Sequence, residues 1–203
     1  MKITAIKQQV RQPNRYSLYV DGKYAFSLSD TALLDAGLAT GQELTEADLT
    51  VLKKMSADDK AYARALNYVA IRPRSRWELV TYLRRKGVEE DGADAVIARI
   101  ERVGLLNDLA FARSWVANRR LLKSVSKRRL VQELRQKHLS DDIIQTVLAE
   151  DETDDRAVLR ELVRRKLQQP RYRADETKLM QYLARQGYGY DDIKLVLQEE
   201  RDA

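Results

Sequence analysis

Apolar and polar residues alternate over the first thirty positions of the chain, a pattern typical of β-strands. The alternation runs through residues 16–20 and resumes at residues 24–28, with Asp21-Gly22 between them. An Asp-Gly pair suits a type I′ hairpin turn, because both central residues of that turn need a positive φ. With residues 3–10 as a third strand, the pattern predicts a small antiparallel sheet.

Helical spacing of apolar residues replaces this alternation further along the chain. Two short helices are predicted over residues 31–36 and 46–54, where they can cover one face of the sheet. We expect a break near Ser56. Beyond it, Ser75 and Glu78 have the spacing of a capping box, which marks the start of a helix.

The helical part of the chain repeats itself. Each copy has a central segment with two leucines four residues apart, the spacing of a buried helix stripe. The central segments are residues 75–88, 126–139 and 175–188, and their leucine pairs are Leu79 and Leu83, Leu130 and Leu134, and Leu179 and Leu183. Longer helices precede them at residues 60–71, 109–122 and 156–167, and shorter helices follow at residues 93–103, 142–149 and 192–198.

One three-helix unit cannot bury its apolar face alone, so neighbouring units have to stack. The sequence therefore predicts a mostly α protein, an elongated and curved array of three tandem three-helix repeats behind a small antiparallel β-sheet and helix domain. The predicted boundaries are 1–56 for the N-terminal domain and 57–107, 108–150 and 151–203 for the three repeats.

Composition removes several classes of function. The chain has no cysteine, which excludes disulfides, thiolate metal sites and cysteine nucleophiles. Its longest apolar stretches are too short to span a membrane, and its first residues lack the apolar core of a signal peptide. We therefore expect a cytoplasmic protein without a membrane partner.

Two features resemble metal or catalytic sites but have simpler structural explanations. The paired aspartates at 58–59, 141–142, 154–155 and 191–192 fall at predicted helix starts, where carboxylates cap free N–H groups. His138, the single histidine, stands where the other repeats have Gly87 and Gly187. That position favours a left-handed backbone, so replacing His138 by glycine is expected to stabilise the chain modestly.

No catalytic set can be assembled from these residues. A triad or zinc site would need a second histidine or a cysteine, and no glycine-rich phosphate loop is present. We therefore expect no enzyme activity, catalytic residue, metal, cofactor or small-molecule substrate. The larger aromatic residues are predicted to pack in the core, with stacking on nucleic-acid bases as the alternative. They are Tyr68, Trp77, Tyr82, Phe111 and Trp115.

Positive charge is concentrated in the middle of the chain. The net charge is +6, and residues 108–150 alone carry nine basic and five acidic side chains. No acidic residue lies between Asp108 and Glu133. A solvated helix face usually mixes both signs, because opposite charges one turn apart support the helix. The one-sign tract therefore predicts a surface that binds an acidic protein groove or a phosphate backbone.

The predicted basic surface extends to similar clusters in the first repeat. One of them, residues 84–86, ends a predicted helix, so compensation of the helix dipole alone is the alternative explanation for it. We expect the residues of the basic surface to be exposed, so replacing Arg119, Arg120, Arg128 and Arg129 by glutamate should leave the fold intact. The full set is Arg72, Arg74, Arg76, Arg84, Arg85, Lys86, Arg113, Arg119, Arg120, Lys123, Lys127, Arg128 and Arg129.

Two segments of the helical part resemble the RecX regulators of the RecA recombinase. They are Arg74-Ser75-x-x-Glu78-Leu79-x-x-x-Leu83-x-x-Lys86-Gly87 and Gly104-Leu-Leu-Asn107-Asp108-x-x-Phe111-Ala112. The segment Arg129-Leu-x-x-Glu133-Leu134-x-x-Lys137 resembles the second repeat of that family, and Val20-Asp21-Gly22 lies in an N-terminal part similar to that of its longer members. His138 departs from the family pattern, which usually has glycine there.

The resemblance implies a non-enzymatic protein that binds the RecA–DNA filament, docks in its groove across adjacent subunits, and usually inhibits strand exchange and ATP hydrolysis. DNA is then a secondary contact. An independent DNA-binding module that acts through its basic face remains the alternative. The matching motifs are themselves architectural, because they cap, pack and end helices, so no binding role passes to them.

Overall fold

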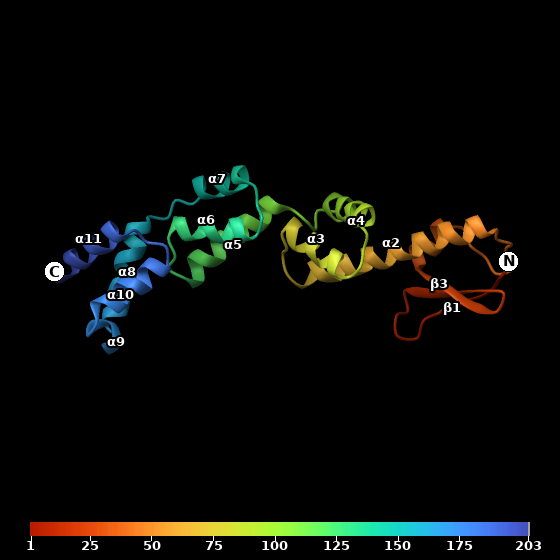
Figure 1. The fold of residues 1–203 in the computed structure, drawn as a ribbon, viewed down its shortest axis with the longest axis horizontal. Coiled ribbons are helices and arrows are strands. Elements are labelled where there is room, and N and C mark those ends of the chain that lie inside the picture. The colour runs from red at the N-terminus through yellow and green to blue at the C-terminus, as the bar shows by residue number, and fades with distance from the viewer. Residues whose placement is uncertain (203) are drawn as a thin grey trace. The chain divides into compact units, whose positions relative to one another are not determined.

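The computed structural model describes residues 1–202, which form a three-stranded sheet followed by eleven helices within that range (Figure 1). This confirms the predicted fold class of an antiparallel sheet in front of helical repeats. The chain divides into two compact units. The first contains residues 1–73 and 79–106, and the second contains residues 74–78 and everything from Asn107 onward.

The N-terminal sheet has the predicted hairpin. Strands β1 (Ile3–Gln8), β2 (Arg15–Val20) and β3 (Lys23–Ser29) pair antiparallel in that order. Asp21 and Gly22 have φ values of 48° and 81°, as the turn between β2 and β3 requires. One face of the sheet is buried through residues such as Leu18 and Leu28.

Helix α1 (Asp30–Asp35) is followed by a single long helix, α2 (Glu46–Ile71), which lies against the sheet in Figure 1. The predicted break near Ser56 is therefore wrong. Ser56 is buried in the middle of α2, and its hydroxyl donates to the Ser27 carbonyl of β3 at 2.7 Å. No glycine or proline interrupts residues 46–71, and the helix continues through Ser56, so the predicted boundary after residue 56 falls inside a helix.

The second half of α2 is the first helix of the first repeat. It packs on α3 (Arg76–Arg85) and α4 (Glu90–Arg102) around the buried pair Leu79 and Leu83. The second repeat consists of α5 (Asp108–Leu122), α6 (Lys127–Gln136) and α7 (Asp141–Ala149), with Leu130 and Leu134 in its core.

The third repeat departs slightly from the predicted pattern. It consists of α8 (Asp155–Leu167), α10 (Glu176–Arg185) and α11 (Tyr190–Arg201), with a one-turn helix α9 (Pro170–Arg173) between the first two. The extra turn was not predicted. Proline at the first helical position favours it, and Tyr172 carries it into the core of the repeat.

In each repeat, an aspartate of the first helix binds a backbone N–H group at the start of another helix, and in the second and third repeats this aspartate is the first residue of its own helix. Asp108 accepts a hydrogen bond from the Arg76 N–H at 2.7 Å, and Asp155 accepts one from the Lys127 N–H at 2.6 Å. Arg76 and Lys127 are the first residues of α3 and α6, whose N–H groups have no partner within their own helices.

Asp59 is the corresponding residue of the first repeat. Its carboxylate accepts hydrogen bonds from the backbone N–H and the hydroxyl of Ser29, which caps α1, at 2.9 and 2.6 Å. It also pairs with the buried Arg15 at 2.9 Å. We call Asp59, Asp108 and Asp155 the helix-start aspartates.

These contacts correct part of the prediction for the aspartate pairs. Asp58 and Asp59 lie in the middle of α2, not at a helix start. The other three pairs do lie at helix starts, and Asp154 caps its own helix by accepting from the Arg156 N–H at 2.9 Å. Asp155 serves a different helix, α6, from the one it begins.

A second contact recurs between the central helices of the second unit. The Ser126 N–H, at the start of α6, donates to the Gln186 carbonyl at the end of α10 at 3.1 Å. At the start of α3, the Ser75 hydroxyl donates to the Lys137 carbonyl at the end of α6, also at 3.1 Å. Ser75 and Ser126, which precede α3 and α6, therefore each contact the end of the central helix of the next repeat.

His138 occupies the left-handed position that the sequence predicts, with a φ of 55°. Its ring stacks on Trp77 with the centroids 4.2 Å apart. The expectation that glycine would stabilise this position omitted the stack. Glycine would relieve about 1 kcal/mol of backbone strain but would also remove an aromatic contact of similar size.

Gly187 and Gly87 form a matched pair of sites for testing the contact between central helices. Both have a positive φ, 94° and 75° respectively. A methyl group on Gly187 would lie 2.4 Å from the Ser126 hydroxyl and 2.9 Å from the Arg129 nitrogen, whereas one on Gly87 meets nothing within 4 Å.

We predict that Gly87→Ala lowers the free energy of unfolding by about 1 kcal/mol, the cost of the left-handed backbone alone. Gly187→Ala should cost about 1–3 kcal/mol more, because α10 and α6 have to move apart. Urea denaturation followed by circular dichroism measures both. Equal losses in the two variants would contradict the tight contact.

Candidate functional site

Much of the predicted basic surface is already paired with carboxylates of the same unit. Arg119 lies 2.6 Å from Glu133, with its guanidinium over the Trp115 ring at 4.4 Å. Arg120 lies 2.6 Å from Asp151 and 2.9 Å from Asp155. The Arg120 and Asp151 side chains are only 13% and 6% exposed, so this pair is part of the interior.

The pKa values of Glu133 and Arg120 show that these contacts stabilise the charged form of each side chain. Burial by itself would raise the pKa of Glu133, but hydrogen bonds from Arg119 and Trp115 outweigh it and keep the pKa below its usual value. Burial opposes the charge on Arg120 in the same way, and the carboxylates of Asp151 and Asp155 raise its pKa nevertheless. These arginines stabilise the fold, and the expectation that both are exposed was wrong.

The rest of the tract divides into paired and open residues. Arg113 forms an exposed ion pair with Glu150 at 2.6 Å, and the Lys127 ammonium donates to the Asp151 carbonyl at 2.6 Å. Lys123 and Arg128 are exposed, and no ion pair involving either occurs among residues 1–202. The one-sign tract is therefore not one continuous binding surface.

Arg128 and Arg129 of α6 lie near a third arginine that was not predicted from the sequence. A hollow of about 490 Å³ in the second unit lies between α6 and the end of α10. We call it the arginine hollow, and its lining residues are Arg128, Arg129, Gln132, Ala184, Arg185, Gly187 and Tyr188. The sequence pattern could not find Arg185, because the contact between α10 and α6 brings it there from a separate helix.

The positive charge of the arginine hollow is only partly neutralised by carboxylates. Glu133 lies 3.5 Å from Arg129, but its closer partner is Arg119 at 2.6 Å. Arg128 and Arg185 are exposed and form no ion pair within the described part of the chain. Guanidinium groups suit carboxylate and phosphate oxygens because they donate two parallel hydrogen bonds. The hollow can therefore receive an anionic group.

The predicted residues of the first repeat fall into two groups. Arg84, Arg85 and Lys86 are exposed at the end of α3 in the first unit. Lys86 also borders a hollow of about 620 Å³ there, where the sequence analysis missed other cations. These are Lys53, Lys54, Lys60 and Arg64. Arg72, Arg74 and Arg76 already have interactions within the protein.

The aromatic residues are mainly structural, as predicted, with one exception. Phe111 is buried, Tyr68 stacks on Tyr82 at 4.1 Å in the first repeat, and the Trp115 indole donates to Glu133 at 2.9 Å. Trp77 is 41% exposed and contacts His138. Its prediction as a core residue was wrong, because the contact lies at the edge of the core.

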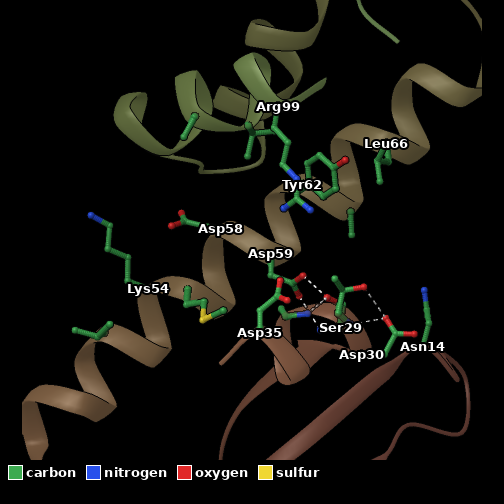
Figure 2. A pocket seen from close by; sticks show the side chains of 17 residues that line it. Asn14, Ser29, Asp30, Asp35, Lys54, Asp58, Asp59, Tyr62, Leu66 and Arg99 are labelled. Atoms are coloured by element: carbon green, nitrogen blue, oxygen red, sulfur yellow. Dashed lines mark hydrogen bonds between the residues drawn. The ribbon is translucent and has the colours of Figure 1, made fainter. Parts of the chain in front are cut away.

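Another hollow, of about 570 Å³, lies in the first unit among α1, α2 and α4 (Figure 2). Some of its polar groups interact with one another. Asp59 accepts from Ser29, as the dashed lines in Figure 2 show, and Arg99 lies 3.7 Å above the Tyr62 ring. These contacts join β3 and α4 to α2, so Asp59 and Arg99 have structural roles.

Residues 1–202 contain no group of three or more histidine, cysteine, aspartate or glutamate side chains arranged to hold a metal ion. Within the same range, no helix is long and apolar enough to cross a membrane.

Arg120 and Arg128, on either side of the 123–127 loop, allow a test of which arginines stabilise the fold and which are only exposed. We predict that Arg120→Glu lowers the free energy of unfolding by about 3–5 kcal/mol, because it leaves buried carboxylates unpaired. Arg128→Glu should change it by less than about 0.5 kcal/mol. Thermal or urea unfolding compares the two variants, and an Arg120→Glu variant as stable as Arg128→Glu would refute the buried pair.

Comparison with known proteins gives matches along nearly the whole chain. Four family models match in order: the regulatory protein RecX N-terminal domain at residues 1–45, and the first, second and third three-helix domains of RecX at residues 61–99, 107–148 and 153–197. The regulatory protein RecX of Leuconostoc citreum is 29% identical over 199 residues, covering 96% of this chain and 74% of that protein.

The regulatory protein RecX of Lactobacillus gasseri is 35% identical over 116 residues, but this covers 57% of the present chain and only 42% of that relative. The chain thus matches less than half the length of that protein. A crystal structure of a regulatory protein RecX matches with a TM-score of 0.74 and 26% identity, over 97% of this chain and 98% of that one. RecX from Lactobacillus salivarius matches with a TM-score of 0.57 and 27% identity, over 70% and 95%. The ordered match of all four domains shows that the chain belongs to the RecX family of regulatory proteins.

Proposed function

We propose that this chain is a non-enzymatic regulator that binds the RecA–DNA filament and modulates, in the usual case inhibits, its recombination and ATPase activities. The observation that carries this proposal is the match of all four RecX domain models in their order along the chain. The RecA filament is the partner that the family resemblance implies. DNA phosphates are a second contact under the same proposal.

The open cations of the second unit support a charged contact with this partner. After internal pairing, Arg128 and Arg185 remain exposed at the arginine hollow, and Lys123 remains exposed beside α5. A cationic hollow favours partners that carry carboxylates or phosphates. The RecA–DNA filament presents both kinds of group, so either component can fill the hollow.

The runner-up function is an independent DNA-binding module. The arginine hollow favours it equally, since phosphate is a good ligand for three guanidinium groups. The two functions differ in their requirement for RecA and in their salt dependence. A phosphate contact on duplex DNA loses affinity with a log–log slope of about −0.9 for each neutralised phosphate.

We predict that Arg128→Glu with Arg185→Glu weakens binding to RecA filaments on single-stranded DNA by at least about tenfold, because like charges then face the partner. Inhibition of the filament ATPase should fall in parallel. Co-sedimentation and a coupled ATPase assay, each at two salt concentrations, provide the measurements. Binding to bare DNA is measured alongside.

The matched control is Arg171→Glu with Arg173→Glu, which reverses two exposed arginines of α9 and changes the net charge equally. It should retain binding. If the wild-type chain binds bare DNA as well as it binds the filament, the DNA-binding module is supported instead. If it does not bind the filament at all, the proposed function is contradicted.

A further inference from the structure

The end of α5 exposes two adjacent leucines that the fold does not use. Leu121 is 81% exposed and Leu122 is 72% exposed, and we call this pair the apolar tip. Single exposed apolar residues are ordinary on protein surfaces. Two adjacent exposed leucines at a helix end are less common. A polar residue such as glutamine or lysine has a similar helix propensity and interacts better with water.

The same place in the first repeat has the same character. Ile71 ends α2, is 77% exposed and is followed by a basic residue, as Leu122 is followed by Lys123. The longer helices of these two repeats thus share an exposed aliphatic residue at the same end. Because α2 and α5 differ in sequence and both end in an exposed aliphatic residue, this exposure is not an accident of one helix.

The loop after the apolar tip is held firmly in place. Arg165 donates to the Ser124 hydroxyl at 3.1 Å, and Arg120 donates to the Val125 carbonyl at 2.6 Å. Val125 itself is buried, and the Lys123 N–H donates to the Arg119 carbonyl at 2.8 Å. A contact fixed before binding loses little conformational freedom when its partner arrives, which favours affinity.

The charges around the apolar tip indicate what it binds. Lys123 follows it directly, and Arg165 contacts the next residue of the loop. Neither Lys123 nor Arg165 forms an ion pair with another of residues 1–202, whereas Arg120 nearby is already paired with Asp151 and Asp155. We propose that the apolar tip inserts into an apolar hollow on a protein partner whose rim carries carboxylates. This inference rests on the proposed function and assigns the contact to the protein of the filament, since leucine gains little from a phosphate backbone.

The test is the double variant Leu121→Ser with Leu122→Ser. Its control is Leu34→Ser with Leu195→Ser, which replaces two other exposed leucines, 79% and 46% exposed, on α1 and α11. We expect the first variant to bind RecA filaments on single-stranded DNA about ten- to a hundredfold more weakly, the effect of losing one or two buried leucine contacts. Binding to bare single-stranded DNA should change less than about twofold, and the control should bind the filament normally.

The outcomes separate the inference from the function on which it rests. A wild-type chain that fails to bind the filament contradicts the proposed function, and the inference with it. A wild-type chain that binds, together with an apolar-tip variant that binds equally well, overturns the inference alone. An equal loss on bare DNA also overturns it, because the leucines would then contact bases. If circular dichroism shows altered folding of the double variant, the single variant Leu122→Ser is measured under the same criteria.

Discussion

The fold depends most on one recurring interaction, a carboxylate that binds the free N–H group at the start of another helix. Asp59, Asp108 and Asp155 make this contact from the first helical segments of the three repeats. A helix start leaves backbone donors without partners, and the helix dipole makes them attractive to an anion. A charged acceptor at 2.6–2.9 Å satisfies both needs at once. Burial raises the pKa of Asp108 while the Arg76 N–H opposes that shift, so holding the aspartate in place has an electrostatic cost.

The carboxylates at these helix starts and around them also determine which charged side chains stay available to a partner. Asp155 binds Arg120 as well as the Lys127 N–H, and Glu133 and Asp151 complete the ion pairs around α5. Arginines that look like a binding tract in the sequence therefore stabilise the protein. In the second unit, the arginine hollow and the apolar tip remain open. The first suits an anionic group and the second an apolar one, which together fit a protein surface better than DNA alone.

The sequence predicts most of the fold because its features are local. Leucine spacing, the Asp-Gly turn and the glycine or histidine after each central helix depend on a few neighbouring residues, and all are found as expected. Prediction from the sequence failed where a residue contacts another residue far along the chain. Ser56 and Asp59 resemble a helix boundary in the sequence but lie within α2, where the Ser56 hydroxyl donates to the Ser27 carbonyl and the Asp59 carboxylate accepts from Ser29. Arg120 is buried by aspartates some thirty residues later. Arg185 reaches the candidate site only through the packing of α10 on α6. Charge counting along the chain could not detect such pairing.

Hydrogen exchange at the Lys127 N–H tests the central claim most directly. The first N–H of an isolated helix has no partner and exchanges rapidly. Here the Asp155 carboxylate should protect it, and Asp155→Asn should speed its exchange by at least about tenfold as the charge-assisted bond is lost. Asp142→Asn, in the first turn of α7, is the control and should leave this rate unchanged. Protection of the Lys127 N–H in the wild type that vanishes in Asp155→Asn supports the account. Rapid exchange in the wild type, or a rate indifferent to Asp155→Asn, would contradict it.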